Sequence, residues 1–154
     1  MERLIILLIG IIIGGIAFPI IGNGVSMESP FGLTLEKNSP SDWVPEEKIS
    51  VKNDVVIIKV ENARLSKYAD TNSMDPVLDK NSNGIEIKAE NPNQIQVGDI
   101  ITHEKNGNLI VHRVIGIGSD EKGWYCITKG DNNSSNDGKI RFEDVRYITV
   151  GIIY

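Results

Sequence analysis

The sequence predicts an all-β domain, built as a small barrel-like sheet and preceded by one N-terminal transmembrane helix. Two observations predict it. An uncharged apolar run occupies residues 4–21, and from residue 49 short β-branched segments alternate with Gly, Asn and Asp turns. With 154 residues the chain has room for one small domain and an appendage. We therefore divide it into an anchor at 1–24, a tether at 25–48 and a β domain at 49–154.

Residues 4–21 have the length and composition of a membrane-spanning helix. A helix of this length extends about 27 Å, close to the thickness of a bilayer core. Arg3 precedes the run and the first charge after it is Glu28. The positive-inside rule therefore predicts a cytoplasmic N-terminus and an extracytoplasmic β domain. A cleaved signal peptide is the alternative, but residues 18–20 are Phe-Pro-Ile where a cleavage site needs small residues.

The rest of the chain predicts a tether followed by strands. Residues 25–48 are rich in Gly, Ser, Pro and Asn, which favours an irregular tether. The pair Asn106-Gly107 predicts a two-residue β-hairpin turn. No amphipathic helix pattern follows the anchor. Alternating or β-branched segments predict strands at 55–60, 85–88, 99–102, 109–117, 124–128 and 147–152.

Charge and cysteine content exclude several classes of partner and site. The net charge is −5, with acidic and basic residues interspersed, so nucleic acid is not expected as a partner. The single cysteine, Cys126, cannot form an internal disulfide, and its apolar neighbours predict a buried structural thiol. No Cys/His cluster has the spacing of a zinc site. We therefore expect no metal and no organic cofactor.

A serine, a histidine and a carboxylate are candidates for nucleophilic catalysis. Ser73, His112 and Asp137 occur in that order, separated by 39 and 25 residues. Such a set can activate a hydroxyl, because the imidazole takes the proton and the carboxylate fixes the imidazole tautomer. The residues alone leave other interpretations open. Ser73 also fits a polar turn, and Asp131 competes with Asp137 for the third position.

The chain contains two histidines, and their surroundings differ. His103 lies beside the hairpin turn with Glu104 and Lys105, which predicts a solvated hairpin end. His112 lies within the apolar segment 109–117, where a histidine is either a satisfied core group or a positioned base.

Three sequence boxes resemble those of the type I signal peptidases in their archaeal and endoplasmic-reticulum form. The boxes are Ser73-Met74-Asp75-Pro76, Val111-His112-Arg113-Val114, and Lys129-Gly130-Asp131-Asn132-Asn133 with Asp137 beyond. The resemblance extends over residues 71–137. It is specific because the boxes agree in order and in approximate spacing.

The resemblance implies a role for each candidate residue. Ser73 would be the nucleophile, His112 the general base and Asp137 the acid that orients the histidine, whereas Asp131 would support the site. The hydroxyl of Thr71 would supplement the oxyanion hole. Relatives commonly have glycine directly before the nucleophile, where this chain has asparagine, a residue that also tolerates unusual dihedral angles.

A serine–lysine dyad is the competing chemistry, because bacterial relatives use it. The dyad needs a desolvated, neutral lysine. We predict that Lys105, Lys122 and Lys129 lie in turns, and His112 occupies the matching box. We therefore expect the histidine mechanism.

The resulting hypothesis is a membrane-anchored serine endopeptidase that removes signal peptides or similar leaders from exported preproteins. The resemblance implies cleavage after small residues, with the lipid bilayer and the protein translocation machinery as partners. Fifty-one residues separate the end of the apolar run at residue 21 from Ser73, which leaves a dedicated protease for one surface protein as an alternative. A non-catalytic anchored β module used for binding or assembly is the second alternative.

Overall fold

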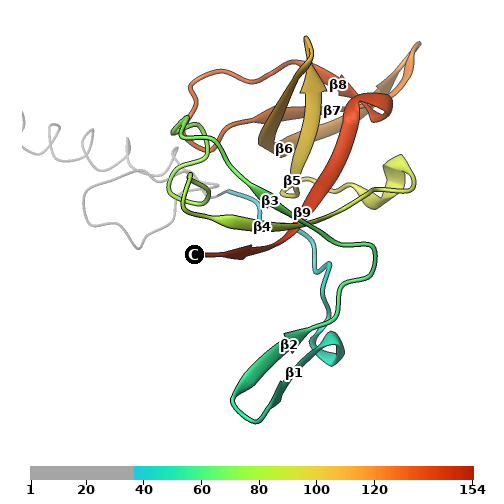
Figure 1. Ribbon diagram of the computed structural model, residues 1–154. Helices are drawn as coiled ribbons and strands as arrows, with labels where there is room; N and C mark the ends of the chain where they lie inside the picture. Colours follow the sequence, from blue (N-terminus) through green and yellow to red (C-terminus); the bar gives the residue numbers. More distant parts are fainter. Residues whose placement is uncertain (1–36) are drawn as a thin grey trace, which may run out of the picture. The chain divides into compact units, whose positions relative to one another are not determined.

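The computed structural model describes residues 37–154, which form an all-β domain, as the sequence predicts (Figure 1). Its strands are β1 (Ile49–Lys52), β2 (Val55–Ile58), β3 (Arg64–Lys67), β4 (Asn83–Ile87), β5 (Ile100–Lys105), β6 (Asn108–Asp120), β7 (Gly123–Lys129), β8 (Lys139–Arg141) and β9 (Val145–Ile153). Short 3-10 helices occur at η1 (Glu46–Lys48), η2 (Pro92–Gln94) and η3 (Phe142–Asp144).

The predicted anchor at 1–24 lies outside the described residues. So does the first part of the predicted tether. A search of residues 37–154 for a helix with the length and apolar character of a membrane span found none.

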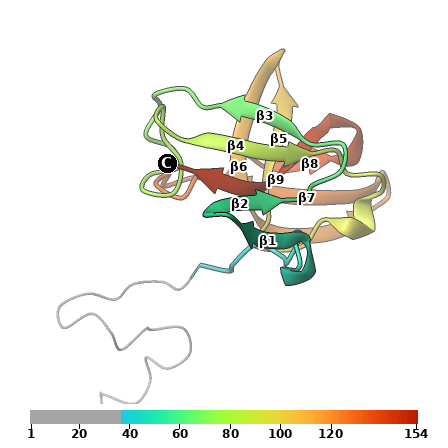
Figure 2. The same ribbon diagram turned by 60° about the horizontal axis from the view of Figure 1, so that its bottom comes forward.

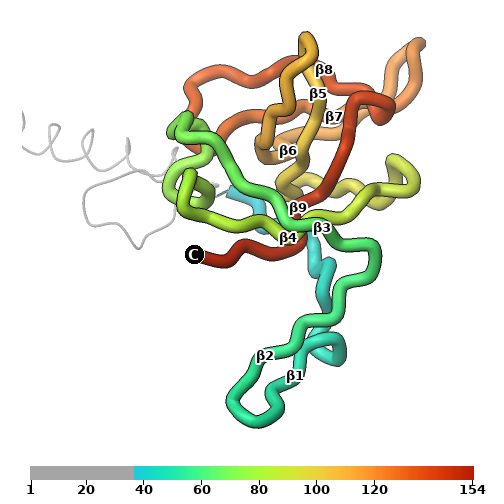
Figure 3. Tube along the Cα trace, in the orientation of Figure 1, coloured from blue at the N-terminus to red at the C-terminus, as the bar shows by residue number. Residues whose placement is uncertain are grey.

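Seven strands form one antiparallel sheet in the order β3-β4-β9-β5-β6-β7-β8. Within the described part of the chain β3 and β8 are its two edges, so the sheet does not close into a barrel. Figure 2 shows β3, β4 and β9 in succession. The chain can be followed along β9 in Figure 3, from its pairing with β5 to its pairing with β4.

Irregularities in strand pairing bend the sheet. Register shifts occur between Ile85 and Glu86, where β4 pairs with β9, and between Thr102 and His103, where β5 pairs with β9. A third shift occurs in β6 between Val114 and Gly116. Because a bulge increases local twist and bends its strand, these shifts curl the sheet.

The β5–β6 hairpin carries both histidines. Asn106 and Gly107 connect the strands with φ values of 53° and 76°, as expected of the predicted two-residue turn. Lys105 therefore pairs with Asn108, and Ile101 pairs with His112.

Two groups of buried side chains form the core. Cys126 belongs to the larger group and is fully buried, which raises the pKa of its thiol to about 12. This thiol is therefore structural, as predicted. The larger group comprises Ile95, Ile101, Val114, Cys126, Ile140 and Ile148, and the smaller group comprises Met74, Leu78 and Ile100.

Strands β1 and β2 form a separate two-stranded sheet. Asn53 and Asp54 connect them with positive φ angles. The predicted strand at 55–60 is thus present as β2, but its side chains are exposed, and Val51 on β1 is 68% exposed. The segment that precedes β1 contacts the larger sheet's domain, since the Trp43 indole N–H donates to the Asp99 carboxylate at 3.1 Å.

Candidate active site

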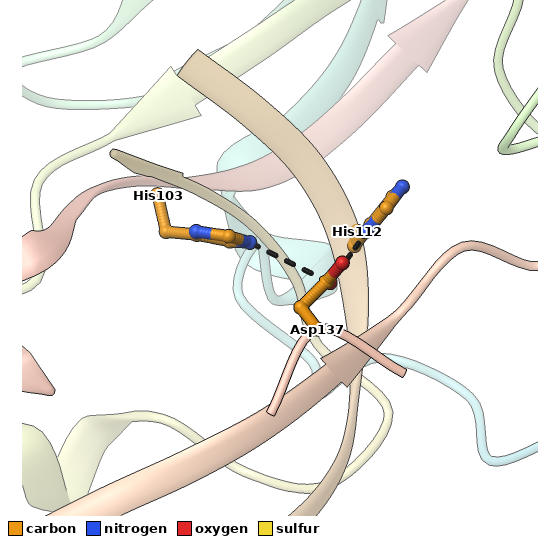
Figure 4. A group of neighbouring side chains, drawn as sticks. All are labelled: His103, His112 and Asp137. Atoms are coloured by element: carbon orange, nitrogen blue, oxygen red, sulfur yellow. Dashed lines mark hydrogen bonds and ion pairs between the residues drawn. The ribbon is translucent and has the colours of Figure 1, made fainter. Parts of the chain in front are cut away.

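His112 lies on β6 with one edge of its ring against a carboxylate. The residue is 6% exposed, and its Nδ1 lies 2.6 Å from Asp137 Oδ2 (Figure 4). An ionised carboxylate only accepts hydrogen bonds, so this contact assigns the hydrogen to Nδ1 of the neutral imidazole. Nε2, on the opposite edge of the ring, then carries a lone pair that can accept a proton.

Asp137 lies in the loop between β7 and β8 and is fixed through backbone and side chain. Its N–H donates to the Thr128 carbonyl at 2.8 Å, and its own carbonyl accepts from Lys105 Nζ at 2.6 Å. Oδ2 also accepts from Thr128 Oγ1 at 2.7 Å. Burial opposes ionisation of Asp137, but hydrogen bonds from His112 and Thr128 and the nearby imidazoles outweigh it, so its pKa lies below the ordinary value. His112 therefore faces a fixed anion.

Ser73 is half-buried and lines the same pocket as His112, a cavity of about 450 Å³. The preceding residue, Asn72, has a φ of 57°, a left-handed conformation that asparagine tolerates. The Ser73 hydroxyl is hydrogen-bonded to Thr71 Oγ1 at 3.1 Å. Among the hydrogen bonds of residues 37–154, none joins this hydroxyl to His112.

The loop that follows β7 holds the backbone of Ser73. Asn132 donates from its backbone to the Ser73 carbonyl and from its side chain to the Asn72 carbonyl, both at 3.0 Å. Gly130 is required by this approach, because a Cβ at that position would lie 2.5 Å from the Ser73 carbonyl oxygen. The loop therefore carries Asp137 at one end and positions Ser73 at the other.

Asp131 binds an arginine. Its two carboxylate oxygens accept from Arg113 at 2.9 and 2.7 Å, and both side chains are buried. Arg113 also donates to the Gly98 carbonyl at 2.9 Å. The two carboxylates of this loop thus have different partners: Asp137 contacts His112, and Asp131 contacts Arg113.

His103 corrects one prediction, because it is 0% exposed and not at a solvated hairpin end. Its Nε2 lies 3.2 Å from Thr128 Oγ1 and 3.7 Å from Asp137 Oδ2. Burial is the main cause of a pKa for His103 below its ordinary value, with smaller opposing effects from Asp137. Asp137 therefore lies between two imidazoles (Figure 4).

The hairpin register could have revealed this position. A two-residue turn at Asn106-Gly107 pairs Ile101 with His112, and His103 lies two residues from Ile101 on β5. Residues two apart on a strand point to the same face. His103 and His112 consequently share a face, and their ring centroids lie 6.4 Å apart. The charged neighbours of His103 in the sequence obscured this signal.

The three lysines considered for a dyad do not offer a desolvated amine. Lys122 lies in a turn, as predicted, but Lys105 ends β5 and Lys129 ends β7. Lys105 and Lys122 are exposed, and Lys129 is half-buried. A dyad base needs burial to remain neutral near pH 7.

Within residues 37–154, His103, His112 and Asp137 form a group whose donor atoms lie within 4.8 Å of one another and could hold a metal ion. Two ligands of a tetrahedral zinc ion, with bonds of about 2.0–2.1 Å, lie roughly 3.3 Å apart. The Nδ1–Oδ2 distance of 2.6 Å is instead that of a hydrogen bond. The present arrangement fits a proton between His112 and Asp137 better than a metal ion.

The hydroxyl of Ser73 and the imidazole of His112 line one pocket, and the carboxylate of Asp137 contacts that imidazole. Such groups can perform acyl transfer through a covalent intermediate. Thr71 adds a hydroxyl that lines the same pocket.

A scan against protein-family models, a search of curated proteins and a search of solved structures each found no match.

Proposed function

We propose that the chain is a membrane-anchored serine endopeptidase that removes signal peptides or similar leaders from exported preproteins. Ser73 is the nucleophile, His112 the general base and Asp137 the residue that orients the histidine. The observation that carries the proposal is the 2.6 Å contact between His112 Nδ1 and Asp137 Oδ2, on a histidine that shares its pocket with Ser73. The resemblance of the three sequence boxes to type I signal peptidases supplies the substrate class.

The reaction follows from these positions. Nε2 of His112 takes the hydroxyl proton as Ser73 Oγ attacks the peptide carbonyl carbon. Thr71 Oγ1, which bonds Ser73 Oγ in the resting site, then donates to the oxyanion. When the C–N bond breaks, His112 returns the proton to the departing amine. Water hydrolyses the acyl-enzyme in a second cycle, with His112 again acting as base.

The pocket supports a peptide substrate. Its volume of about 450 Å³ is within the usual range for ligand sites, and its lining includes apolar residues beside Ser73, namely Met74, Leu78 and Val111. Strand β3, which pairs only with β4 among the described strands, lines the pocket through Arg64, Ser66 and Lys67. An exposed sheet edge next to a nucleophile favours binding of an extended chain.

We extend the proposal to location and fold. Residues 1–24 would anchor the protein with its N-terminus in the cytoplasm, and the β domain would act outside the membrane. The anchor restricts the enzyme to the plane in which leader peptides lie, which raises the effective concentration of substrate. The curled sheet would then be an open form of the signal peptidase-like fold.

The test is cleavage of a membrane preprotein by the full-length chain in lipid vesicles. Wild type should release a mature product whose N-terminus follows a small residue. Ser73→Ala should abolish release, whereas Ser119→Ala, which removes the same atom from an exposed position on β6, should not. Equal cleavage by Ser73→Ala and wild type would exclude this nucleophile, and no cleavage by wild type would favour a non-catalytic module.

A further inference from the structure

We propose that His103 is a positioning residue for this reaction, and that it acts through Thr128 on the carboxylate of Asp137. The inference rests on the proposed function and adds a residue that the serine–histidine–aspartate set does not contain. His103 is not among the residues that line the pocket, so it cannot touch the substrate there. Its effect must reach His112 through the groups between them.

A continuous series of short contacts connects His103 to His112. His103 Nε2 lies 3.2 Å from Thr128 Oγ1, which lies 2.7 Å from Asp137 Oδ2. The same Oδ2 atom lies 2.6 Å from His112 Nδ1. The histidines come from β5 and β6, the threonine from β7, and the aspartate from the loop that follows β7. The carboxylate oxygen that orients His112 is thus itself held by a network.

The hydrogens in this network have one consistent arrangement. Thr128 has a single hydroxyl hydrogen, and the Asp137 carboxylate, which only accepts, receives it. Thr128 Oγ1 must then accept a hydrogen bond from His103, so His103 carries its hydrogen on Nε2. The opposite tautomer would bring two lone pairs together at 3.2 Å. His103 therefore fixes the direction in which the Thr128 hydroxyl points.

The histidine is an unexpected choice for this buried position. Within the described residues its Nδ1 is buried without a hydrogen-bond partner, and an unpaired buried polar atom lowers folding stability. Burial is the largest effect on the pKa of His103 and lowers it. The nearby Asp137 raises this pKa, whereas His112 and Lys105 lower it further. A neutral His103 donates to Thr128 without competing with His112 for the charge of Asp137. An aromatic ring without nitrogen would fill the same space but could not donate.

The experiment compares turnover and melting temperature for substitutions at the two ends of the His103–Thr128 contact, in the full-length protein. His103→Phe keeps a ring and removes the donor, so kcat should fall about tenfold, the effect of losing one hydrogen bond in a buried network. KM should change little, and the melting temperature should be unchanged or higher. His103→Gln, whose amide nitrogen can replace Nε2, should restore most of the turnover, whereas the shorter His103→Asn should not.

A double-mutant cycle tests whether the effect passes through Thr128. Thr128→Val should lower kcat more than His103→Phe does, and the double variant should be no slower than Thr128→Val alone. Thr149→Val makes the same chemical change at a buried threonine of β9 outside the network, and its kcat should match wild type. Additive losses in the double variant, or an unchanged kcat in His103→Phe, would overturn the role of His103 while leaving the proposed function intact.

A third measurement does not depend on activity. Nitrogen-15 NMR of the imidazoles in the detergent-solubilised protein should find His103 protonated on Nε2 and His112 protonated on Nδ1. A hydrogen on Nδ1 of His103 would overturn the proposed network. A wild-type protein that cleaves no preprotein would instead overturn the proposed function, and the role of His103 with it.

Discussion

Replacing Asp137 by asparagine isolates the charge of the group that contacts His112. Oδ2 of Asp137 accepts from two donors, His112 Nδ1 at 2.6 Å and Thr128 Oγ1 at 2.7 Å. Asparagine has the same shape and can still turn its single oxygen toward both donors. It cannot supply the negative charge that stabilises the imidazolium when His112 takes the serine proton. If its amide nitrogen faces His112 instead, the imidazole must adopt the wrong tautomer.

The magnitude follows from the separation of the charges. Unit charges about 4 Å apart interact by about 4 kcal/mol at the effective dielectric constant of sites near a protein surface. At 1.36 kcal/mol for each factor of ten, this interaction corresponds to about a thousandfold in rate. Loss of the correct tautomer adds to it, and the same substitution in a well-studied serine protease costs about 10⁴. We therefore predict that the kcat of Asp137→Asn falls by roughly 10³- to 10⁴-fold. Its KM and melting temperature should stay near those of wild type.

Asp131→Asn is the matched comparison, because it makes the same change in the same loop. Asp131 and Arg113 form an ion pair with side-chain exposures of 3% and 8%. Removing one partner of a buried pair costs about 3–5 kcal/mol. Because asparagine keeps part of the hydrogen bonding, we take the lower value, which lowers the melting temperature of a domain this size by roughly 10 °C. Its rate loss should be smaller than that of Asp137→Asn.

The assay is single-turnover cleavage of a preprotein at saturating enzyme, combined with thermal unfolding of both variants. Single-turnover conditions separate the chemical step from product release. If Asp131→Asn is inactive but stable while Asp137→Asn is active, the two carboxylates have been assigned in reverse. If both variants retain the wild-type rate, neither carboxylate orients the base.

Three further results are expected. Gly130→Ala should lower both turnover and melting temperature, because its Cβ would lie 2.5 Å from the Ser73 carbonyl oxygen, whereas Gly116→Ala, whose Cβ meets no atom closer than 4.0 Å, should do neither. Lowering the pH from 7 to 5 should reduce the free energy of unfolding of wild type, measured by urea titration. Burial lowers the pKa of His103 below its ordinary value of 6.5. As the pH falls, the unfolded state therefore protonates this imidazole before the folded state does, which favours unfolding. The loss of unfolding free energy should be smaller in His103→Phe, which has no such imidazole. Protein extracted from membranes should begin at Met1 or Glu2 by N-terminal sequencing; a start near Gly24 would indicate a cleaved leader.

Local patterns predicted most of the strands, and non-local pairing decided the rest. The apolar segments at 109–117 and 124–128 are the central parts of β6 and β7, and the Asn106-Gly107 turn is in place. Strands β1, β3 and β8 escaped prediction because each has only three or four residues and one or two large apolar side chains. The sequence also could not show that β9 pairs with both β4 and β5, or that the sheet stays open.

For the candidate site, the residues alone gave several candidates, and the resemblance of the sequence boxes was needed to choose among them. The apolar segment around His112 and the polar loop before Asp137 made both residues candidates, and the resemblance to the type I signal peptidases selected them over the alternatives. In the structure His112 Nδ1 and Asp137 Oδ2 lie 2.6 Å apart. His103 was assigned to solvent because Glu104 and Lys105 follow it. The hairpin register places His103 on the same buried face as His112, so pairing between strands outweighed local polarity.

The loop after β7 has two fixed ends and a solvent-exposed tip. A turn closed by the bond from Asn133 N–H to the Gly130 carbonyl secures the end that holds Ser73, and the bond from Asp137 N–H to the Thr128 carbonyl secures the other. Residues 134–136 between these bonds are exposed. Because the entropic cost of a longer loop grows slowly with its length, extra residues at 134–136 need not move either end. This tip is therefore the place where a reporter peptide or an affinity tag can be inserted within the site loop itself.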